Sequence, residues 1–393
     1  MTKRRKRRRP SSPTTKKSKA KTKNSGTILC FQDVWKEYCS KNTSDDQEDM
    51  DAQISNVFFE LANAPSVSYR LEAVPSLSQS PNLPLTAMGD QDDSDAIETI
   101  NDVVTRQGTT TSLASSNTIV IHQDVSGAAQ NHTGGIVWET SYLLLNYLLT
   151  SDEWLGTGLT VCTPRTVLEI GAGCGMLGLS LHKAFEMGIL KRNNEGDGTH
   201  ASGMLPSSRV ILTETNDVME NLRGNFERNY PSFSSAETTE KPPPVAQQHR
   251  VSVEELDWTR FREDCARSKI DAHSIDCIVG TDVVFSTRFV LPMLETMRFL
   301  SHPHTVIYLC LQERCRDSHR LLLKEAISYG FRVEDISETV YQDERLAPSC
   351  SFGRALECKL LRFTVVAAER APPNRNKKKK SKKNKKKVSQ NKN

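Results

Sequence analysis

Two spacings of apolar residues alternate along much of the chain. From residue 117 onward, short apolar runs are separated by longer segments with apolar residues at helical spacing. The short runs predict buried strands, and the longer segments predict helices with one apolar face. The predicted strands cover residues 117–123, 165–170, 209–214, 250–254, 275–280, 305–311, 331–336 and 356–366. The predicted helices cover residues 138–149, 176–187, 218–229, 288–300 and 318–329.

This alternation predicts an α/β fold over residues 117–368. Chains of this kind form mostly parallel sheets, because each helix carries the chain back across one face of the sheet. We therefore expect helices on both faces. Two polar segments, 191–208 and 232–247, are expected to be inserted surface loops.

The chain before residue 117 follows weaker patterns. Residues 27–38 and 54–62 carry some apolar pattern, which predicts a strand and a short helix in an N-terminal extension over 25–116. Residues 85–117 are rich in Ser, Thr, Asp, Asn and Gln, a composition typical of a linker. The extension is therefore expected to be partly disordered.

The charge distribution adds two tails to this picture. Residues 1–24 and 370–393 each hold 12 of the 52 Lys and Arg residues and no acid. The remaining 28 basic and 48 acidic residues give residues 25–369 a net charge of −20. We expect 1–24 and 369–393 to be disordered polybasic tails. Such tails favour residence in the nucleus or nucleolus, with a cytoplasmic pool allowed, and weak contact with RNA.

The cysteines and the hydropathy exclude several classes of protein. The ten cysteines include no C-x-x-C pair and no Cys/His array with zinc spacing, so we expect free thiols, a reducing compartment and no metal. The basic N-terminus lacks the apolar run of a signal peptide, and no stretch approaches the roughly 18 apolar residues of a membrane span. We expect a monomer without a membrane partner.

The strongest chemical signal is the sequence TVLEIGAGCGMLG at 166–178. A strand ends in an acid, a glycine-rich turn follows, and a helix begins. Glycines allow a tight turn and the close approach of a ligand. A plain tight turn or a dinucleotide fingerprint are the alternatives, but the glycines run G-x-G-x-G rather than G-x-G-x-x-G.

The segment EIGAGCG resembles motif I of the class I, seven-strand methyltransferases that use S-adenosylmethionine. The resemblance implies a Rossmann-like, seven-strand, mostly parallel sheet. It also implies S-adenosylmethionine as the cofactor, with its methionine part wrapped by the glycine turn. Glu169, Gly171, Gly173 and Gly175 are the expected contacts.

Two later strand ends complete the expected cofactor site. Glu214 suits a ribose, because a carboxylate can accept hydrogen bonds from both hydroxyls; a helix N-cap is the alternative. Asp257 and Trp258 follow the third strand, where the resembled family places adenine, and Trp258 could stack on that ring. An ordinary core tryptophan is the alternative role for Trp258.

The segments GIVWE at 135–139 and GTDVVF at 280–285 narrow the resemblance. The non-SET, seven-strand protein-lysine methyltransferases (methyltransferase family 16) carry a tryptophan before the first helix of the domain and a D-x-x-Y motif after the fourth strand, and the two segments resemble these features. The resemblance covers roughly residues 117–366. Trp138 and Thr281 are therefore expected beside the cofactor. Phe285 stands where most of that group has Tyr, which excludes a role for a phenol hydroxyl there.

The narrower resemblance implies methyl transfer from S-adenosylmethionine to a lysine amine of a protein substrate. Asp282 is expected to orient the amine by a hydrogen bond, although a helix N-cap is its alternative role. Phe285 and Trp138 would line the approach. Which protein and which lysine are modified does not follow from the sequence.

Three other functions stay open. A protein-histidine methyltransferase is a close neighbour of the lysine enzymes. The basic tails favour an RNA methyltransferase, but no N/D-P-P-Y/F tetrapeptide follows the fourth strand, no catalytic Pro-Cys pair is present, and the body of the chain is acidic. A non-catalytic interaction module with the same fold is the third.

Overall fold

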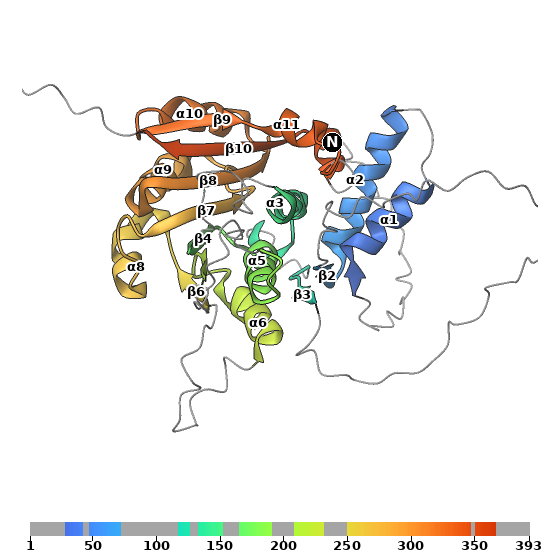
Figure 1. The fold of residues 1–393 in the computed structure, drawn as a ribbon, viewed down its shortest axis with the longest axis horizontal. Helices are drawn as coiled ribbons and strands as arrows, with labels where there is room; N and C mark the ends of the chain where they lie inside the picture. Colours follow the sequence, from blue (N-terminus) through green and yellow to red (C-terminus); the bar gives the residue numbers. More distant parts are fainter. Residues whose placement is uncertain are drawn as a thin grey trace, which may run out of the picture.

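The computed structural model describes residues 28–41, 47–71, 117–125, 133–151, 165–190, 208–231, 250–346 and 350–366. These residues form two β-sheets and the helices that pack on them (Figure 1). Both expected tails lie outside the described residues. So do the expected linker and the two expected inserted loops, apart from Asn117 and Ser208.

The larger sheet has seven strands in the order β6-β5-β4-β7-β8-β10-β9. All neighbouring strands are parallel except β10, which runs antiparallel to both β8 and β9. The expected Rossmann-like, mostly parallel sheet is therefore confirmed. Its strands are β4 (Thr166–Ile170), β5 (Arg209–Glu214), β6 (Arg250–Glu255), β7 (Ile275–Thr281), β8 (Ser301–Gln312), β9 (Phe331–Asp335) and β10 (Cys358–Val365).

Side chains of this sheet alternate between two apolar cores, one on each face. In β4, Val167 belongs to one core, whereas Leu168 and Ile170 belong to the other. The first core is covered by α3 (Glu139–Thr150), α5 (Met176–Glu186) and α6 (Met219–Asn229). The second is covered by α8 (Phe261–Ser268), α9 (Thr287–Leu300) and α10 (Arg316–Ala326), as Figure 1 shows. Helices therefore cover both faces, as predicted.

Helix α8 has no counterpart among the predicted helices. Its sequence, FREDCARS, is short and half charged, with only Phe261 and Cys265 facing the core as buried apolar residues. Two apolar positions do not make a recognisable helical pattern. Two further short helices, α11 (Ser337–Gln342) and α13 (Phe352–Ala355), precede β10.

The smaller sheet corrects the expected place of one strand. It has the order β1-β2-β3, with β1 (Leu29–Cys30), β2 (Ser66–Arg70) and β3 (Thr118–His122). The strand predicted over 117–123 exists, but it pairs antiparallel with β2 and joins the smaller sheet. Alternation in TIVIH predicts a strand with one buried face, and it does not tell which strand will be the partner.

The smaller sheet and its helices, α1 (Phe31–Lys41) and α2 (Gln47–Asn63), form a unit that we call the N-terminal module (residues 28–71 and 117–125). Its aromatic side chains pack on α3. The rings of Phe31 and Tyr142 stack with centroids 4.2 Å apart, and both side chains are buried. Tyr69 donates a hydrogen bond to the Asn146 side chain. Where the sequence predicted a strand over 27–38, the described residues form the two-residue strand β1 followed by helix α1, and the helix predicted over 54–62 lies within α2. These parts of the extension, which was expected to be partly disordered, share a core with α3.

The order of the larger sheet reverses between β4 and β7. From β4 the chain moves outward through β5 and β6, and it then returns to β7 on the other side of β4. Connections leave the carboxyl ends of these two central strands in opposite directions, which opens a crevice there. Of the helices in the described ranges, none is long and apolar enough to cross a membrane.

Candidate functional site

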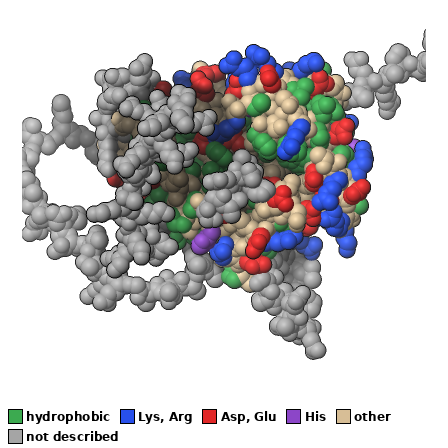
Figure 2. All heavy atoms as spheres, turned by 180° about the vertical axis from the view of Figure 1, so that it is seen from behind, with side chains coloured by type: hydrophobic (Ala, Val, Ile, Leu, Met, Phe, Trp, Pro, Cys, Tyr) green, Lys and Arg blue, Asp and Glu red, His purple; other side chains and the backbone are tan. Residues whose placement is uncertain are grey.

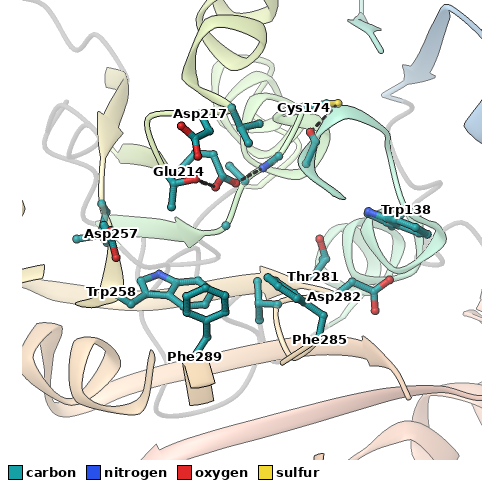
Figure 3. A pocket seen from close by; sticks show the side chains of 18 of the residues that line it. Trp138, Cys174, Glu214, Asp217, Asp257, Trp258, Thr281, Asp282, Phe285 and Phe289 are labelled. Carbon is teal, nitrogen blue, oxygen red and sulfur yellow. Dashed lines mark hydrogen bonds between the residues drawn. The ribbon is translucent and has the colours of Figure 1, made fainter. Parts of the chain in front are cut away.

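A cavity of about 910 Å³ lies at the carboxyl ends of β4, β5, β6 and β7. This volume falls in the range of small-molecule sites, roughly 300–1,000 Å³. Figure 3 shows Asp257 and Trp258 at one end and Trp138 at the other, with Glu214 and Thr281 between them. Its walls come from residues 134, 136–138, 141, 171–174, 176, 214–218, 256–260, 281–283, 285, 288 and 289.

The glycine turn after β4 forms one wall of this pocket. Gly171 and Gly173 have positive φ angles of 61° and 53°. A Cβ on Gly171 would lie 2.9 Å from the Val283 side chain, and a Cβ on Gly173 would lie 3.2 Å from the Gly134 carbonyl oxygen. Only glycine therefore keeps both this backbone path and the space beside it.

Two of the expected cofactor contacts lie behind the wall instead. Gly175 does not line the pocket; it precedes α5 with a φ of 87°, and a Cβ there would lie 2.6 Å from Leu222. Glu169 is also absent from the walls, with 1% of its surface exposed. Its Oε2 accepts a 2.9 Å hydrogen bond from the Gly178 backbone N–H. Both residues support the turn rather than face a ligand.

Glu214 lies on the pocket wall at the end of β5, as predicted. Its Oε2 accepts a 2.9 Å hydrogen bond from the Gly173 N–H, and its Oε1 accepts one of 2.8 Å from the Thr215 N–H. Burial raises the pKa of this carboxyl, and these donors oppose the rise. Oε1 also accepts a 3.2 Å hydrogen bond from the Thr215 hydroxyl, so the acceptor position that stays open for a ligand hydroxyl is on Oε2.

Asp257 and Trp258 lie at the far end of the pocket, beside Glu214. The Trp258 indole packs edge-on against Phe289, with ring centroids 6.3 Å apart. The Asp257 Oδ1 accepts hydrogen bonds from the Thr259 N–H and hydroxyl, at 2.8 and 2.7 Å. An apolar slot with a carboxylate at its edge suits a flat ring that carries an amino group.

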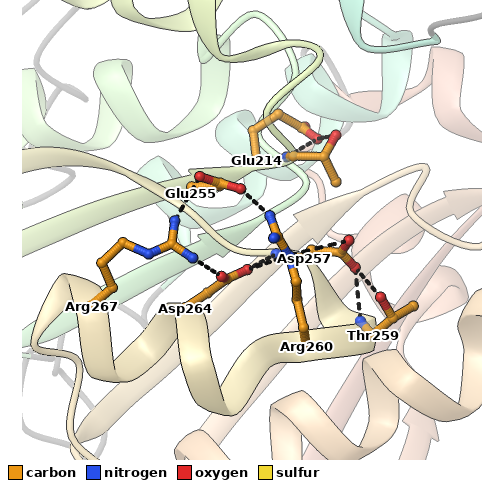
Figure 4. A network of polar contacts seen from close by, with 8 residues as sticks. Glu214, Glu255, Asp257, Thr259, Arg260, Asp264 and Arg267 are labelled. Atoms are coloured by element: carbon orange, nitrogen blue, oxygen red, sulfur yellow. Dashed lines mark hydrogen bonds and ion pairs between the residues drawn. The ribbon is translucent and has the colours of Figure 1, made fainter.

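A network of polar contacts holds the turn between β6 and α8 that carries Asp257 and Trp258 (Figure 4). The Asp257 N–H donates a 2.8 Å hydrogen bond to Oδ2 of Asp264, whose side chain is fully buried on α8. Asp264 and Glu255 both pair with Arg260 and with Arg267. The network thus joins the end of β6 to the start of α8.

Asp282 lies on the wall near Trp138, at a φ of 50°. Its Oδ1 accepts a 2.8 Å hydrogen bond from the Gln312 N–H, and its Oδ2 forms a 2.8 Å ion pair with Arg314. The Thr281 hydroxyl lies 3.0 Å from that of Ser141. The helix after Asp282 begins at Thr287 and has Ser286 as its N-cap residue. Asp282 is therefore not the N-cap of this helix, which was the alternative role expected for it.

Phe285 stands at the mouth of the pocket, with 41% of its surface exposed. Its ring lies 5.7 Å from that of Phe289. Such exposure is high for a large aromatic side chain, and a pocket mouth is where an exposed ring can contact a ligand. The structure thus brings Phe285, Asp282 and Trp138 to the same end of the pocket, as the motifs predicted.

Arg314 is a residue of this site that the motifs did not indicate. One nitrogen, Nη2, lies 2.8 Å from both Asp282 Oδ2 and Glu139 Oε1, and its guanidinium carbon lies 4.2 Å from the centre of the Trp138 ring. Burial raises the pKa of Glu139, and the charge of Arg314 lowers it. Arg314 therefore ties together two wall segments, one before α3 and one after β7.

Other wall residues were also missed, among them Ile136, Val137, Ser141, Asp217, Arg288 and Phe289. They could have been predicted from their closeness to the motifs in the sequence, because each lies within a few residues of Trp138, Glu214 or Phe285. No cluster of His, Cys, Asp and Glu in the described ranges could hold a metal ion.

Comparison with known proteins identifies the relatives of this chain. A family model described as lysine methyltransferase matches residues 114–326. Mouse protein-lysine N-methyltransferase EEF2KMT is 25% identical over 230 residues, which are 57% of this chain and 58% of that protein. Xenopus tropicalis protein N-lysine methyltransferase METTL21A is 24% identical over 201 residues, 51% of this chain and 70% of that protein.

A solved structure gives a more distant likeness. Precorrin-6y C5,15-methyltransferase from Geobacter metallireducens is 14% identical, with a TM-score of 0.27 over 44% of this chain and 64% of that chain. The chain spans less than two thirds of the length of the mouse relative. The family match, however, covers more than half of this chain, including the strands and turns that build the pocket as far as α10. The chain therefore belongs to the lysine methyltransferase family.

Proposed function

We propose that this protein is an S-adenosylmethionine-dependent methyltransferase that modifies a lysine side-chain amine of a protein substrate. One observation carries the proposal: a single pocket joins the glycine turn and Glu214 to an end walled by Trp138, Asp282 and Phe285. The first part suits an adenosyl cofactor, and the second suits an alkyl amine. The family match and the relatives with lysine methyltransferase names support the same activity.

The wall residues fit S-adenosylmethionine. Gly171 and Gly173 leave open a cradle that a Cβ would fill or distort, Glu214 offers an open acceptor position on Oε2 for a ribose hydroxyl, and Trp258 offers an apolar face for the adenine. When bound, the cofactor supplies an electrophilic methyl group on a sulfonium sulfur. The chain itself would bind this group, exclude water and align the amine with it.

The other end of the pocket fits a lysine side chain. Aromatic rings attract alkyl-ammonium groups, and Trp138 and Phe285 both line this end. The amine must lose a proton before it can react, since the usual pKa of lysine is ~10.4. Both Asp282 oxygens already accept a hydrogen bond, and Arg314 shares the charge. We therefore assign Asp282 to orienting the amine rather than to removing its proton.

The first test is calorimetric titration of the full-length protein with S-adenosylhomocysteine. Gly173→Arg should abolish binding, because the side chain would enter the cradle. Gly330→Arg is the matched control: its φ of 78° imposes a similar backbone cost, but a Cβ there meets only Arg298, at 3.8 Å. Binding that survives in Gly173→Arg, or is absent from the folded wild type, would refute the cofactor assignment.

The second test identifies the substrate class. The protein and labelled S-adenosylmethionine are incubated with a cell lysate, which is then treated with protease or with nuclease. We expect protease-sensitive label that amino-acid analysis recovers as methyl-lysine. Recovery as methyl-histidine, or loss of label to nuclease, would replace the lysine assignment by one of the alternatives. On the face in Figure 2, acidic and basic described side chains are interspersed rather than gathered in a basic stripe, which favours a protein substrate.

A substitution at Asp282 tests its assigned role. Asp282→Asn is preferable to alanine, because asparagine tolerates the left-handed φ of this position and still accepts from Gln312. We expect methyl transfer to fall roughly 10- to 100-fold, since a misplaced amine loses alignment. Binding of S-adenosylhomocysteine should change by less than about twofold, because the cradle is intact. Full activity in this variant would contradict the assignment.

The basic tails support a proposal on location and partners. The dense Lys and Arg runs fit import into the nucleus or nucleolus and weak RNA contact by a monomeric enzyme. Microscopy of tagged protein without 1–24 and 369–393 tests the location. We expect redistribution to the cytoplasm; an unchanged distribution would refute it. Sedimentation of the purified protein tests the monomer.

A further inference from the structure

Both edges of β3 are occupied, although it has a strand partner on only one side. One edge pairs with β2. On the other edge, Asn229 of α6 donates to the Val120 carbonyl at 2.7 Å and accepts from the Val120 N–H at 3.0 Å. Asn225, one turn earlier, donates to the His122 carbonyl at 3.0 Å and accepts from the His122 N–H at 2.9 Å. The two carboxamides thus take the place of a neighbouring strand.

Asn225 makes two side-chain contacts that Asn229 does not. Its Oδ1 accepts a 3.2 Å hydrogen bond from Nη1 of Arg228 on the same helix. Its Nδ2 also donates a 3.0 Å hydrogen bond to the Cys174 carbonyl, in the middle of the glycine turn. Asn225 is fully buried, so water does not replace its partners. One amide group therefore holds β3 and the wall of the cofactor pocket together.

A second buried amide makes a similar link to the opposite wall. Gln123, just after β3, accepts a 2.5 Å hydrogen bond from the Val137 N–H. Its Nε2 donates at 2.8 Å to the carbonyls of Leu61 and Ala64, at the end of α2. Val137 lines the pocket and directly precedes Trp138. This wall is thus anchored to α2 through one side chain.

We propose that the N-terminal module is a positioning element of the cofactor pocket, acting through Asn225 on the glycine turn and through Gln123 on the Val137 wall. The two walls come from separate segments of the chain. The module is linked to the glycine turn through Asn225 of α6, which pairs with β3, and it bonds directly to Val137 through Gln123. The inference rests on the proposed function only for the identity of the ligand. By linkage, a ligand that orders these walls also stabilises the module.

The contacts predict different behaviour for two chemically equal substitutions. Asn225→Ala and Asn229→Ala each remove a carboxamide that pairs with β3. Only Asn225→Ala also frees the Cys174 carbonyl and with it the glycine turn. A purely structural role would make the effect on ligand binding follow the loss of stability in both variants. A positioning role separates the two.

The experiment compares full-length wild type, Asn225→Ala, Asn229→Ala and Gln123→Ala well below their melting temperatures. We expect Asn225→Ala to weaken S-adenosylhomocysteine binding roughly 3- to 10-fold, the equivalent of one buried hydrogen bond, and Asn229→Ala to leave it within about twofold. Hydrogen exchange on the ligand-free proteins is measured in parallel. Exchange over residues 171–175 should rise in Asn225→Ala alone, and exchange at Val137 should rise in Gln123→Ala.

The two readouts separate this inference from the proposed function. If the wild type fails to bind S-adenosylhomocysteine, the proposed function is refuted, and exchange in the free proteins still decides the positioning role. Equal exchange over 171–175 in the two asparagine variants would overturn that role for Asn225. Unchanged exchange at Val137 in Gln123→Ala would overturn it for Gln123.

Discussion

Glu169 and Glu214 stand at the ends of neighbouring parallel strands, yet their surroundings give them different tasks. Glu214 lines the pocket and keeps an open acceptor position on Oε2, whereas Glu169 is buried behind the glycine turn. Burial raises the pKa of Glu169 to about 8, although the Gly178 N–H opposes the rise. The nearby charge of Glu214 contributes to this rise. Glu169 therefore carries a proton in the folded protein at pH values where it would be ionised in the unfolded chain.

This proton predicts a pH-dependent contribution to stability. A raised folded-state pKa stabilises the protein below the unfolded value of 4.5, and the stabilisation is lost as pH rises from 4.5 to about 8. Glu169→Gln keeps an acceptor for Gly178 and does not titrate. The free energy of unfolding of the variant should therefore rise relative to wild type across this window, by up to ~1.4 kcal/mol per pH unit.

Urea unfolding of both proteins at several pH values measures the difference. Glu186→Gln serves as the control, because this residue forms an i,i+3 ion pair with Lys183 and lies away from the pocket walls. A constant difference between wild type and Glu169→Gln from pH 5 to pH 8 would show that Glu169 is ionised in the folded state.

Single residues were predictable where a motif fixed their place along one strand end. Gly171, Gly173, Glu214 and Trp258 each follow a strand, and the parallel sheet brings those ends together. Arg314 could not be found in this way, because it lies 32 residues from Asp282 along the chain. Glu169 was misjudged for another reason: a motif gives the residue type, but only packing decides whether a side chain faces the ligand or the core.

At the scale of elements, the turn between β6 and α8 depends on one buried acid. Asp264 accepts the Asp257 N–H and pairs with two arginines that are 45% and 53% exposed. Those arginines also pair with Glu255, so they keep a partner if Asp264 is lost. The Asp257 N–H would not keep its acceptor. The position of Trp258, one residue later, is therefore linked to α8.

We predict that Asp264→Ala destabilises the protein by ~1–3 kcal/mol, the cost of a buried donor without an acceptor. It should also weaken S-adenosylhomocysteine binding, because Asp257 and Trp258 lose their support. Asp264→Asn retains an acceptor for the Asp257 N–H and should restore most of the binding. Thermal unfolding and calorimetry measure the two effects.

The matched control for this prediction is Glu338→Ala. Its ion pair with Arg354 is exposed on both sides, 70% and 58%, and such pairs contribute ~0–1 kcal/mol. A similar loss of binding in Glu338→Ala, or intact binding in Asp264→Ala, would contradict a role for the network in holding the pocket.

Elements were predicted well where the apolar pattern was long, and poorly where their partner was remote. Strands β4 to β10 follow the apolar runs, and their alternation with helices predicted a mostly parallel sheet but not the order of its strands. Strand β3 was predicted as an element but not as part of the smaller sheet, because its partner β2 lies about fifty residues earlier in the chain. Helix α8 has too few apolar positions to produce a pattern.

At the scale of the whole molecule, the N-terminal module and the larger sheet share one core. The same apolar cluster contains Phe31 and Phe58 of the module, Tyr142 of α3 and Phe352 of α13. Phe58 and Phe352 lie with ring centroids 4.8 Å apart. Burial of each such ring removes roughly 150–250 Å² from water. The module is therefore expected to be required for folding, and not only for ligand affinity.

Two truncations test this dependence. Deleting residues 1–71 removes α1, α2 and β2, and it exposes Tyr142 and Phe352, which are fully buried in the intact protein. We expect that variant to be insoluble or to lack a cooperative melting transition, because exposed aromatic surface promotes aggregation.

Deleting residues 1–27 leaves every contact described above in place. That variant should melt within about 2 °C of wild type, as surface changes usually do. Differential scanning calorimetry of the two purified proteins makes the comparison. A soluble 72–393 fragment that melts cooperatively and binds S-adenosylhomocysteine like wild type would show that residues 28–71 are not needed for folding. It would also limit the module's share in the pocket to residues 117–125, which the fragment retains.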